Sequence, residues 1–299
     1  MCFPQRVKRR NLILGLGSIG LCGARSPIER THKANLRLGL AAYSFREHFA
    51  WLKGKAQKAA SPALDLFGFL DYCAEHGVAG AELTGYFFPP DADQRYFRKI
   101  RHHAHVRGVT ICGTAIGNNF SRGRGDHLDQ EIASAKKWID RAGWMGAPHV
   151  RFFAGTAKDF AKGTDRMKVA IEALQECSDY AAKRGVFVGV ENHGNLSSGQ
   201  VLEIVKDVKS EWFGINLDTG NFRSEDPYGD LEKCLPYAVN VQLKLEMKTP
   251  NGKAYEADLT RIGQILKKGK YQGFVVLEYE EEKAFKNVPG ALEKLKVVL

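Results

Sequence analysis

Groups that can bind a cation or move a proton stand at the ends of apolar runs in this sequence. In VFVGVENHGN, five mostly apolar residues lead directly into Glu191, Asn192 and His193. The same arrangement recurs along the chain, where other apolar runs also end in carboxylates, amides or basic groups. The residues of interest are Glu82, Asn118, Asn119, Arg151, Glu191, His193, Asp218, Asn221, Gln242, Lys244 and Glu278.

Four of these groups are carboxylates in apolar runs, and three of the four, Glu191, Asp218 and Glu278, come from runs in the second half of the chain that we expect to converge. Burying a carboxylate costs free energy unless the group is paired or holds a metal. Three carboxylates that converge would have to share their charge with a cation, and Gln242 would contribute an oxygen between them. The pattern therefore predicts a divalent metal site, and the alternative is a set of salt-bridged residues at a rim.

These side chains need a scaffold that brings strand ends together. Short apolar runs alternate with amphipathic helical patterns, and several runs are continuous, which is typical of parallel strands covered on both faces. The helical pattern at 61–77 has Ser61 as its expected N-cap and Pro62 at its first position, and similar patterns cover 127–143, 164–185 and 258–269. We expect strands at 36–43, 78–83, 109–116, 149–155, 186–192, 213–218, 239–245 and 274–279.

Eight strands, each followed by a helix-length segment, predict an α/β fold of one domain, a (β/α)₈ TIM barrel over residues 36–299. The active site of such a barrel lies at the C-terminal ends of its strands, where the polar groups above would meet. A doubly wound sheet is the alternative fold. It would need a glycine-rich phosphate loop after the first strand, and AAYSFREHF at that position has no such glycines.

Four segments resemble the strand signatures of the xylose-isomerase-like TIM barrel superfamily, which includes sugar phosphate isomerases and epimerases, ketose 3-epimerases and an endonuclease. They are VENHG, INLDTGNF, VQLK and VVLEYE, and the resemblance covers roughly residues 36–299. In the ketose epimerases one metal is held by Glu, Asp, His and Glu from successive strands. The resemblance therefore implies metal ligation by Glu191, Asp218, Gln242 and Glu278.

The chain departs from that pattern at two positions. Many relatives have His where this chain has Gln242, and many have a second His where it has Asn221. Gln242 is then either a ligand or a group that supports a ligand. An all-oxygen ligand set favours Mn²⁺ or Mg²⁺, with Co²⁺ or Zn²⁺ as alternatives.

The resemblance implies a divalent-metal-dependent sugar isomerase or epimerase that abstracts a proton beside a carbonyl and passes through an enediolate. Glu191 and Glu278 would act as base and acid from opposite faces, and Lys244 and His193 would hold or protonate oxygens. Each of these roles has a structural alternative, such as a supporting hydrogen bond or a pair with a neighbouring charge. The expected substrate contacts are Glu82, Asn118, Asn119, Arg151, Asn221 and Tyr43.

Other functions share parts of this pattern. A lyase or hydratase acting on a 3-keto sugar would use the same enediolate, and a non-catalytic barrel could bind sugar alone. An AP endonuclease is disfavoured because Gln242 and Asn221 replace two expected His ligands. The excess of basic residues is scattered, so we expect a small-molecule sugar and no nucleic acid as partner. A homodimer is a further expectation that the sequence leaves open.

Residues 1–24 differ in composition from the rest of the chain. A basic stretch at 6–10 precedes an apolar, glycine-rich stretch at 11–24, which predicts a signal peptide. The pair Arg9–Arg10 resembles a twin-arginine signal, so we expect export to the periplasm, with residues 25–35 as a short linker. The alternative is a basic tail. No apolar run reaches 18 residues, so no membrane anchor is expected.

Export bears on the substrate, the charge and the cysteines. An exported enzyme is not expected to act on a phosphorylated cytoplasmic intermediate, so a free sugar or a 3-keto derivative is favoured. Removing residues 1–24 takes away four basic residues and no acidic ones, so the formal charge falls from +10 to +6. Outside that segment the cysteines are far apart within apolar stretches, and we expect buried free thiols at Cys73, Cys112, Cys177 and Cys234.

Overall fold

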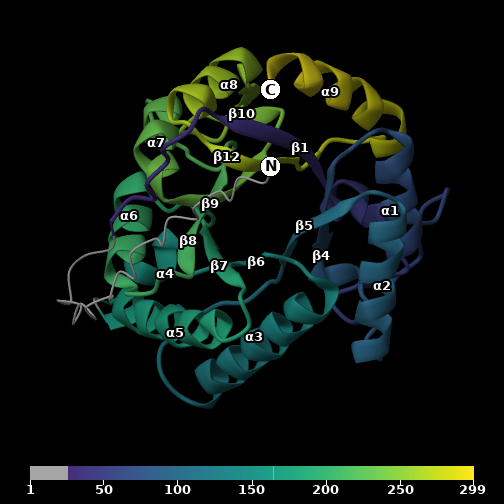
Figure 1. Cartoon of the computed structure of the whole chain (residues 1–299). Coiled ribbons are helices and arrows are strands. Elements are labelled where there is room, and N and C mark those ends of the chain that lie inside the picture. The colour runs from purple at the N-terminus through teal and green to yellow at the C-terminus, as the bar shows by residue number, and fades with distance from the viewer. Residues whose placement is uncertain (1–25, 164) are drawn as a thin grey trace, which may run out of the picture.

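A closed barrel of parallel strands forms the centre of the computed structural model, which describes residues 26–163 and 165–299 (Figure 1). The strands follow one another in the order β1-β12-β9-β8-β7-β6-β5-β4, so that the first strand pairs with the last. All eight expected strands are present, which confirms the TIM barrel. They are β1 (Asn35–Ala41), β4 (Gly80–Thr84), β5 (Thr110–Ala115), β6 (His149–Phe152), β7 (Phe187–Glu191), β8 (Phe213–Asp218), β9 (Ala238–Leu243) and β12 (Gln272–Leu277).

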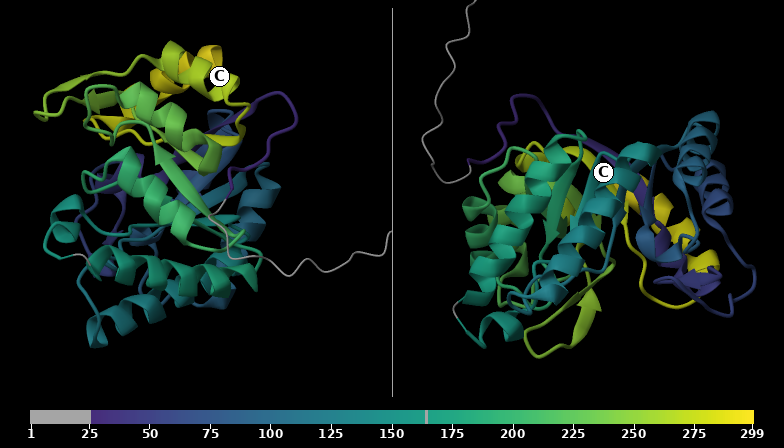
Figure 2. Two further views of the ribbon diagram at one scale, coloured as in Figure 1. Left: turned by 90° about the vertical axis from the view of Figure 1, so that its left-hand side faces the viewer. Right: turned by 90° about the horizontal axis from the view of Figure 1, so that it is seen from below.

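Helices surround the barrel on its outside (Figures 1 and 2). Their buried faces carry the apolar residues that cover the strands. Short 3₁₀ segments, η1 (Ala42–His48), η2 (Gly85–Phe87) and η3 (Leu235–Tyr237), complete the connections. The α-helices are α1 (Leu66–Glu75), α2 (Gln94–Val106), α3 (Asp126–Met145), α4 (Ala157–Phe160), α5 (Asp165–Ala182), α6 (Ser198–Asp207), α7 (Pro227–Cys234), α8 (Leu259–Lys268) and α9 (Ala284–Val298).

The first helix begins later than its sequence pattern indicates. The pattern places the N-cap at Ser61, whereas in the structure α1 is capped by Asp65, which accepts a hydrogen bond from the Gly68 amide at 2.7 Å. Asp and Ser are both strong N-cap residues, so local sequence does not choose between two caps four positions apart. The segment before α1 contains a small hairpin of β2 (Trp51–Leu52) and β3 (Lys55–Ala56).

The interior of the barrel has an apolar part and a polar part. Ala41, Cys112, Phe274 and Val276 form a small apolar cluster there. On the neighbouring strands β8 and β9 the inward positions carry amides instead, and these are hydrogen-bonded across the two strands. The inside of the barrel is therefore apolar on the side of β1, β5 and β12, and polar on the side of β8 and β9.

Residues 26–34 run along the strands' N-terminal end. The Ile28 amide donates to the Pro236 carbonyl at 2.8 Å, and the Arg30 guanidinium donates to three carbonyls between Leu235 and Ala238. The predicted signal peptide lies outside the described residues. Cys73, Cys112, Cys177 and Cys234 are free and buried, as expected.

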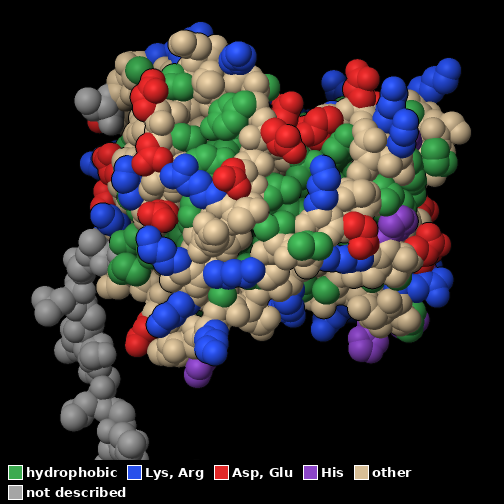
Figure 3. All heavy atoms as spheres, turned by 90° about the horizontal axis from the view of Figure 1, so that it is seen from above, with side chains coloured by type: hydrophobic (Ala, Val, Ile, Leu, Met, Phe, Trp, Pro, Cys, Tyr) green, Lys and Arg blue, Asp and Glu red, His purple; other side chains and the backbone are tan. Residues whose placement is uncertain are grey.

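On the surface, basic side chains are spread among acidic ones over the face that Figure 3 shows, rather than gathered in one stripe. A second hairpin, β10 (Glu246–Lys248) with β11 (Ala254–Glu256), follows β9 and projects from the barrel (Figure 2). Among the described helices, none has the length and apolar character needed to cross a bilayer.

Candidate active site

The C-terminal ends of five neighbouring strands bring most of the expected groups together. Glu191 ends β7, Asp218 ends β8, Lys244 and Glu278 directly follow β9 and β12, and Arg151 lies in β6. Two buried ion pairs define the arrangement. Arg151 Nε lies 2.8 Å from Glu191 Oε2, and Lys244 Nζ lies 3.3 Å from Asp218 Oδ2.

Lys244 occupies the centre of this cluster. Its ammonium lies 3.5 Å from Glu278 Oε2, 3.2 Å from Glu280 Oε2 and 3.3 Å from Asn221 Oδ1, in addition to its contact with Asp218. Side chains two residues apart on a strand share a face, so Lys244 follows Gln242 into the interior as expected. The side chain of Lys244 is only 12% exposed, so its charge is balanced by these carboxylates rather than by water.

Both oxygens of Glu191 have partners. Oε2 pairs with Arg151, and Oε1 accepts a hydrogen bond from Asn221 Nδ2 at 2.9 Å. Arg151 is held in turn by the Ile116 carbonyl at 2.7 Å and lies over the Phe153 ring at 4.1 Å. Arg151 and Asn221, expected as substrate contacts, therefore orient Glu191 in this structure.

The three polar residues of VENHG, Glu191, Asn192 and His193, lie in different environments. Glu191 points into the barrel, while the buried amide of Asn192 exchanges two hydrogen bonds with the backbone of Asp218, at 2.8 and 2.9 Å. This bridge fixes the ends of β7 and β8 side by side. His193 lies at the rim, with its ring against Phe153 at 4.3 Å. Partial desolvation and then the charges of Arg151 and Lys244 lower the pKa of His193, so it is neutral at pH 7.

Two further expected residues lie around this cluster. Glu82 in β4 is fully buried, and burial raises its pKa although the charge of Arg151 opposes that shift. Tyr43 is half-buried in η1, in an edge-to-face contact with Tyr86 at 6.3 Å. Burial and then the charge of Glu278 raise the pKa of Tyr43.

Asn118 and Asn119 are bound to the chain around them instead of facing the cluster. Asn118 exchanges hydrogen bonds with the backbone of Phe153 at 2.7 and 2.9 Å, which ties the segments after β5 and β6 together. Asn119 Oδ1 accepts from the amide and the hydroxyl of Ser121. These contacts give both asparagines a structural role, and their contact with substrate stays a prediction.

Burial dominates the acid–base behaviour of the carboxylates. It raises the pKa of Glu191 to about 7 against the opposing charge of Arg151, and it raises the pKa of Asp218 and, still further, that of Glu278. Burial alone would lower the pKa of Lys244, but the carboxylates around it, led by Asp218, raise that pKa well above its usual value. Burial therefore shifts the acids of the cluster towards their protonated forms, while the surrounding carboxylates favour the charged form of Lys244.

These shifts predict that the metal-free protein loses stability as the pH rises from 5 to 8. The pKa of Glu191 rises on folding from 4.5 to about 7, so its stabilising contribution is full below 4.5 and is lost as the pH passes 7. The loss between pH 5 and pH 8 would be about 2–3 kcal/mol for this group. Urea denaturation with a chelator present measures it, and Glu191→Gln should flatten the pH dependence. An identical free energy of unfolding at both pH values would show that Glu191 is ionised throughout.

The donors of the cluster suit a hard divalent cation, because Glu191, Asp218 and Glu278 offer carboxylate oxygens. Here the ammonium of Lys244 is the cation between Asp218 and Glu278. Across residues 26–163 and 165–299, no three His, Cys, Asp or Glu side chains are arranged to hold a metal ion as they stand. A divalent ion would require Lys244 to move aside, and Glu280 at the rim already offers its ammonium a partner.

Gln242, the fourth expected ligand, is hydrogen-bonded to the neighbouring strand β8. Its Oε1 accepts a hydrogen bond from Asn216 Nδ2 at 2.8 Å, and its buried Nε2 has no hydrogen-bond partner. In this arrangement Gln242 is a supporting group bonded to β8, and its role as a metal ligand stays a prediction. The bond depends on the neighbouring Asn216, which the strand-end pattern did not include.

The sequence pattern missed three residues that shape the site. Glu280 contacts Lys244, Thr219 Oγ1 accepts from the Lys244 amide at 3.0 Å, and Asn216 orients Gln242. Glu280 could have been found, since it lies two positions after Glu278 in LEYEEE. Thr219 and Asn216 carry no comparable signal, because their roles depend on which strands become neighbours.

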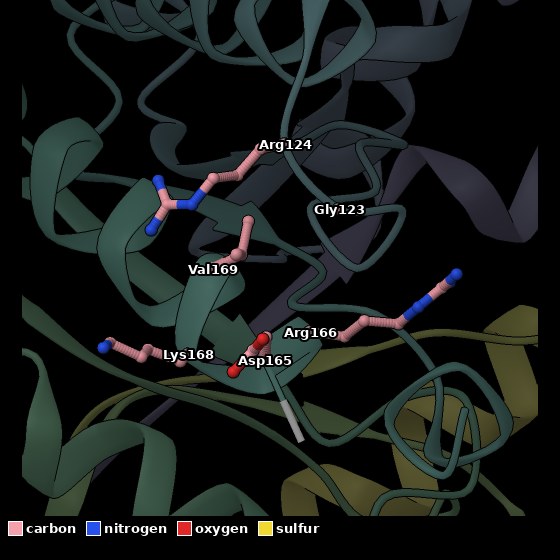
Figure 4. A pocket seen from close by; sticks show the side chains of 6 residues that line it. All are labelled: Gly123, Arg124, Asp165, Arg166, Lys168 and Val169. Carbon is pink, nitrogen blue, oxygen red and sulfur yellow. The ribbon is translucent and has the colours of Figure 1, made fainter. Parts of the chain in front are cut away.

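A separate surface pocket of about 390 Å³ lies over the start of α5 (Figure 4). It is lined by the loop after β5 and by the first turn of α5, and none of the clustered carboxylates reaches it. Its basic side chains, Arg124, Arg166 and Lys168, spread apart rather than converge on one point (Figure 4). Arg124 is paired with Glu172, and Arg166 donates to the Ser121 carbonyl. We therefore assign no function to this pocket.

The fold agrees with what sequence and structure comparisons find. The family model described as "Xylose isomerase-like TIM barrel" matches residues 70–298, so the chain belongs to this family. Among curated protein sequences, none matches this chain.

Several solved structures have the same fold at low sequence identity. A D-psicose 3-epimerase is 16% identical with a TM-score of 0.69, and 88% of this chain aligns with 99% of it. A 3-keto-D-glucoside 4-epimerase from E. coli is 13% identical with a TM-score of 0.65, covering 88% of this chain and 100% of that one. A probable 3-DHS dehydratase from Bacillus anthracis is 16% identical, with a TM-score of 0.65 and coverage of 87% and 98%. These likenesses establish the fold.

Proposed function

We propose that this protein is a sugar isomerase or epimerase that moves a proton at a carbon beside a carbonyl. The observation that carries the proposal is the buried cluster at the strand ends, where Asp218 and Glu278 pair with Lys244 and Glu191 pairs with Arg151. Carboxylates with raised pKa values near neutral pH are suited to general acid–base work. The epimerases among the structures of the same fold support this class of reaction.

Within this site the two glutamates have different environments. Glu191 is paired with Arg151 and has a pKa near 7, which suits a base that must be partly deprotonated at neutral pH. The pKa of Glu278 is raised well above its ordinary value, which favours its acid form. We therefore assign the base to Glu191 and the acid to Glu278, in the metal-free state. Lys244 and His193 would hold or protonate substrate oxygens from the centre and the rim.

A divalent cation is part of this proposal, with Mn²⁺ or Mg²⁺ favoured by the oxygen donors. Glu191, Asp218 and Glu278 would hold it. When bound, such an ion polarises a carbonyl and stabilises negative charge on the enediolate oxygens. Lys244 would then lie further out, towards Glu280, where its ammonium could still reach a substrate hydroxyl.

Deuterium uptake tests the reaction class directly. The protein would be incubated in heavy water with free ketoses and with 3-keto glycosides, with and without Mn²⁺, and each sugar examined by NMR. Deuterium at the carbon beside the carbonyl is the expected result. Loss of water or of an aglycone instead of exchange would assign a lyase, which shares the enediolate, and binding without exchange would leave a sugar-binding barrel.

Export to the periplasm is a proposal based on residues 1–24 alone. Replacing Arg9 and Arg10 with Lys is expected to retain the protein in the cytoplasm, because the paired arginines resemble a twin-arginine signal. Fractionation followed by immunoblotting measures the distribution. Arg6→Lys serves as the matched control, since it makes the same change outside the pair. Equal periplasmic amounts of the double variant and the control would reject the twin-arginine route.

A further inference from the structure

A chain of three buried amides runs along the inside of the barrel towards the carboxylates. Asn240 Nδ2 donates to Asn216 Oδ1 at 2.8 Å, and Asn216 Nδ2 donates to Gln242 Oε1 at 2.8 Å. None of the three residues is more than 2% exposed. Gln242 is the register partner of Asp218 on the neighbouring strand, so the upper end of the chain lies beside the carboxylate cluster.

Asn240, the lower end of this chain of amides, lies away from the carboxylates. Asn240 lines a cavity of about 620 Å³ at the opposite end of the barrel, beneath the segment that contains Ile28 and Arg30. The amide chain therefore extends from the layer of the carboxylates to the strands' N-terminal ends. A change at its lower end can be made without touching the cluster itself.

Hydrogen-bond direction is transmitted along such a chain. A side-chain amide has a donor end and an acceptor end, so the bond on one side decides which end remains for the other side. Because Asn240 donates, Asn216 accepts with its oxygen and presents its nitrogen to Gln242. Gln242 is then left with Nε2 as its free end, and that nitrogen is buried without a hydrogen-bond partner. A buried N–H₂ in this state costs free energy until an acceptor reaches it.

We propose that Asn216 and Asn240 are positioning residues that set which end of the Gln242 amide is free, an inference that rests on the cation site proposed above. In the direction seen here, Gln242 offers N–H groups and no oxygen. Reversing all three amides together would free Oε1 and make Gln242 an oxygen ligand. Reversing Gln242 alone would bring two donors face to face at Asn216, so the three amides reverse as a unit.

Asn240→Asp tests this coupling from a distance. A carboxylate only accepts, so Asn216 must turn its nitrogen down to residue 240 and Gln242 must donate to Asn216, which frees Oε1. Calorimetric titration with Mn²⁺ at pH 8 should show affinity roughly 10–100-fold above wild type, as for other groups that orient metal ligands. Asn240→Leu, which imposes no direction, should fall between the two. Gln272→Glu adds the same charge to the lower cavity outside the chain of amides and should bind like wild type.

The outcomes separate this inference from the proposed cation site. If wild type binds Mn²⁺ and Asn240→Asp binds no more tightly, the cation site stands and the coupling is wrong. If only Asn240→Asp binds, the coupling stands and the wild-type cation site is wrong. If neither binds, both are wrong.

A measurement on wild type covers the case in which Asn240→Asp does not fold. With ¹⁵N-labelled Asn and Gln, saturation with Mg²⁺ should shift the side-chain amide signals of Gln242, Asn216 and Asn240 together and slow the exchange of the Gln242 amide protons. Signals that stay in place at saturation would overturn the inference.

Discussion

Glu191→Gln and Glu278→Gln are each expected to slow net turnover of the sugar by about 10²–10⁴-fold. A carboxamide has nearly the shape of the carboxylate, but it cannot accept and return a proton. The variants should fold, because Gln at position 191 can still accept from Arg151 while the Asn221 amide turns its oxygen towards the new NH₂ group, and Gln at 278 can still accept from Lys244. Turnover and exchange are measured by NMR in heavy water, and the fold by thermal unfolding.

The pair of variants also distinguishes one base from two. If Glu191 alone removes the proton, Glu278→Gln should retain near wild-type exchange but lose net turnover, because the acid is missing. Glu281→Gln is the matched control, since Glu281 lines a separate surface pocket along α9. Wild-type exchange in both single variants would remove the proton-transfer role from the glutamates and leave Lys244 and His193 as the groups to test.

Asp218→Ala is expected to weaken Mn²⁺ or Mg²⁺ binding by at least about 100-fold, more than the loss of a group that merely orients a ligand. Asp218 is fully buried, one of its oxygens is held by the Gly220 amide at 2.8 Å, and the other faces Lys244. Its loss leaves Glu191 and Glu278 as the remaining carboxylate donors of the proposed site. Elemental analysis of the purified protein and calorimetric titration measure the change.

A second effect of Asp218→Ala does not depend on any metal. Lys244 loses its shortest contact with a buried carboxylate, so its ammonium should move towards Glu280 and its pKa should fall. Asp230→Ala is the control, because Asp230 is also a buried aspartate but is bound by Ser198 and Ser224. Undiminished metal content in Asp218→Ala, with the control also unchanged, would show that the proposed site is wrong.

The barrel could be predicted from the sequence because short local patterns specify its strands and helices. Continuous apolar runs such as 186–190 are long enough to cross the barrel wall, and the helical patterns between them specify the alternation of strand and helix. The convergence of Glu191, Asp218 and Glu278 followed from that alternation, since parallel strands place their C-terminal ends on one side. The cap at Asp65 was missed because two good capping residues lie within one turn of each other.

The roles of the converging groups were decided by tertiary structure. Sequence placed Lys244, Gln242 and Asn118 at strand ends, but it could not show that Lys244 lies between two carboxylates, or that Gln242 is bound by Asn216. Nor could it show that the Asn118 amide is used by the backbone of Phe153. The physical reason is that strand periodicity determines the face on which a side chain lies, whereas its hydrogen-bond partners come from other strands. A donor or a charge can take either role until those neighbours are in place.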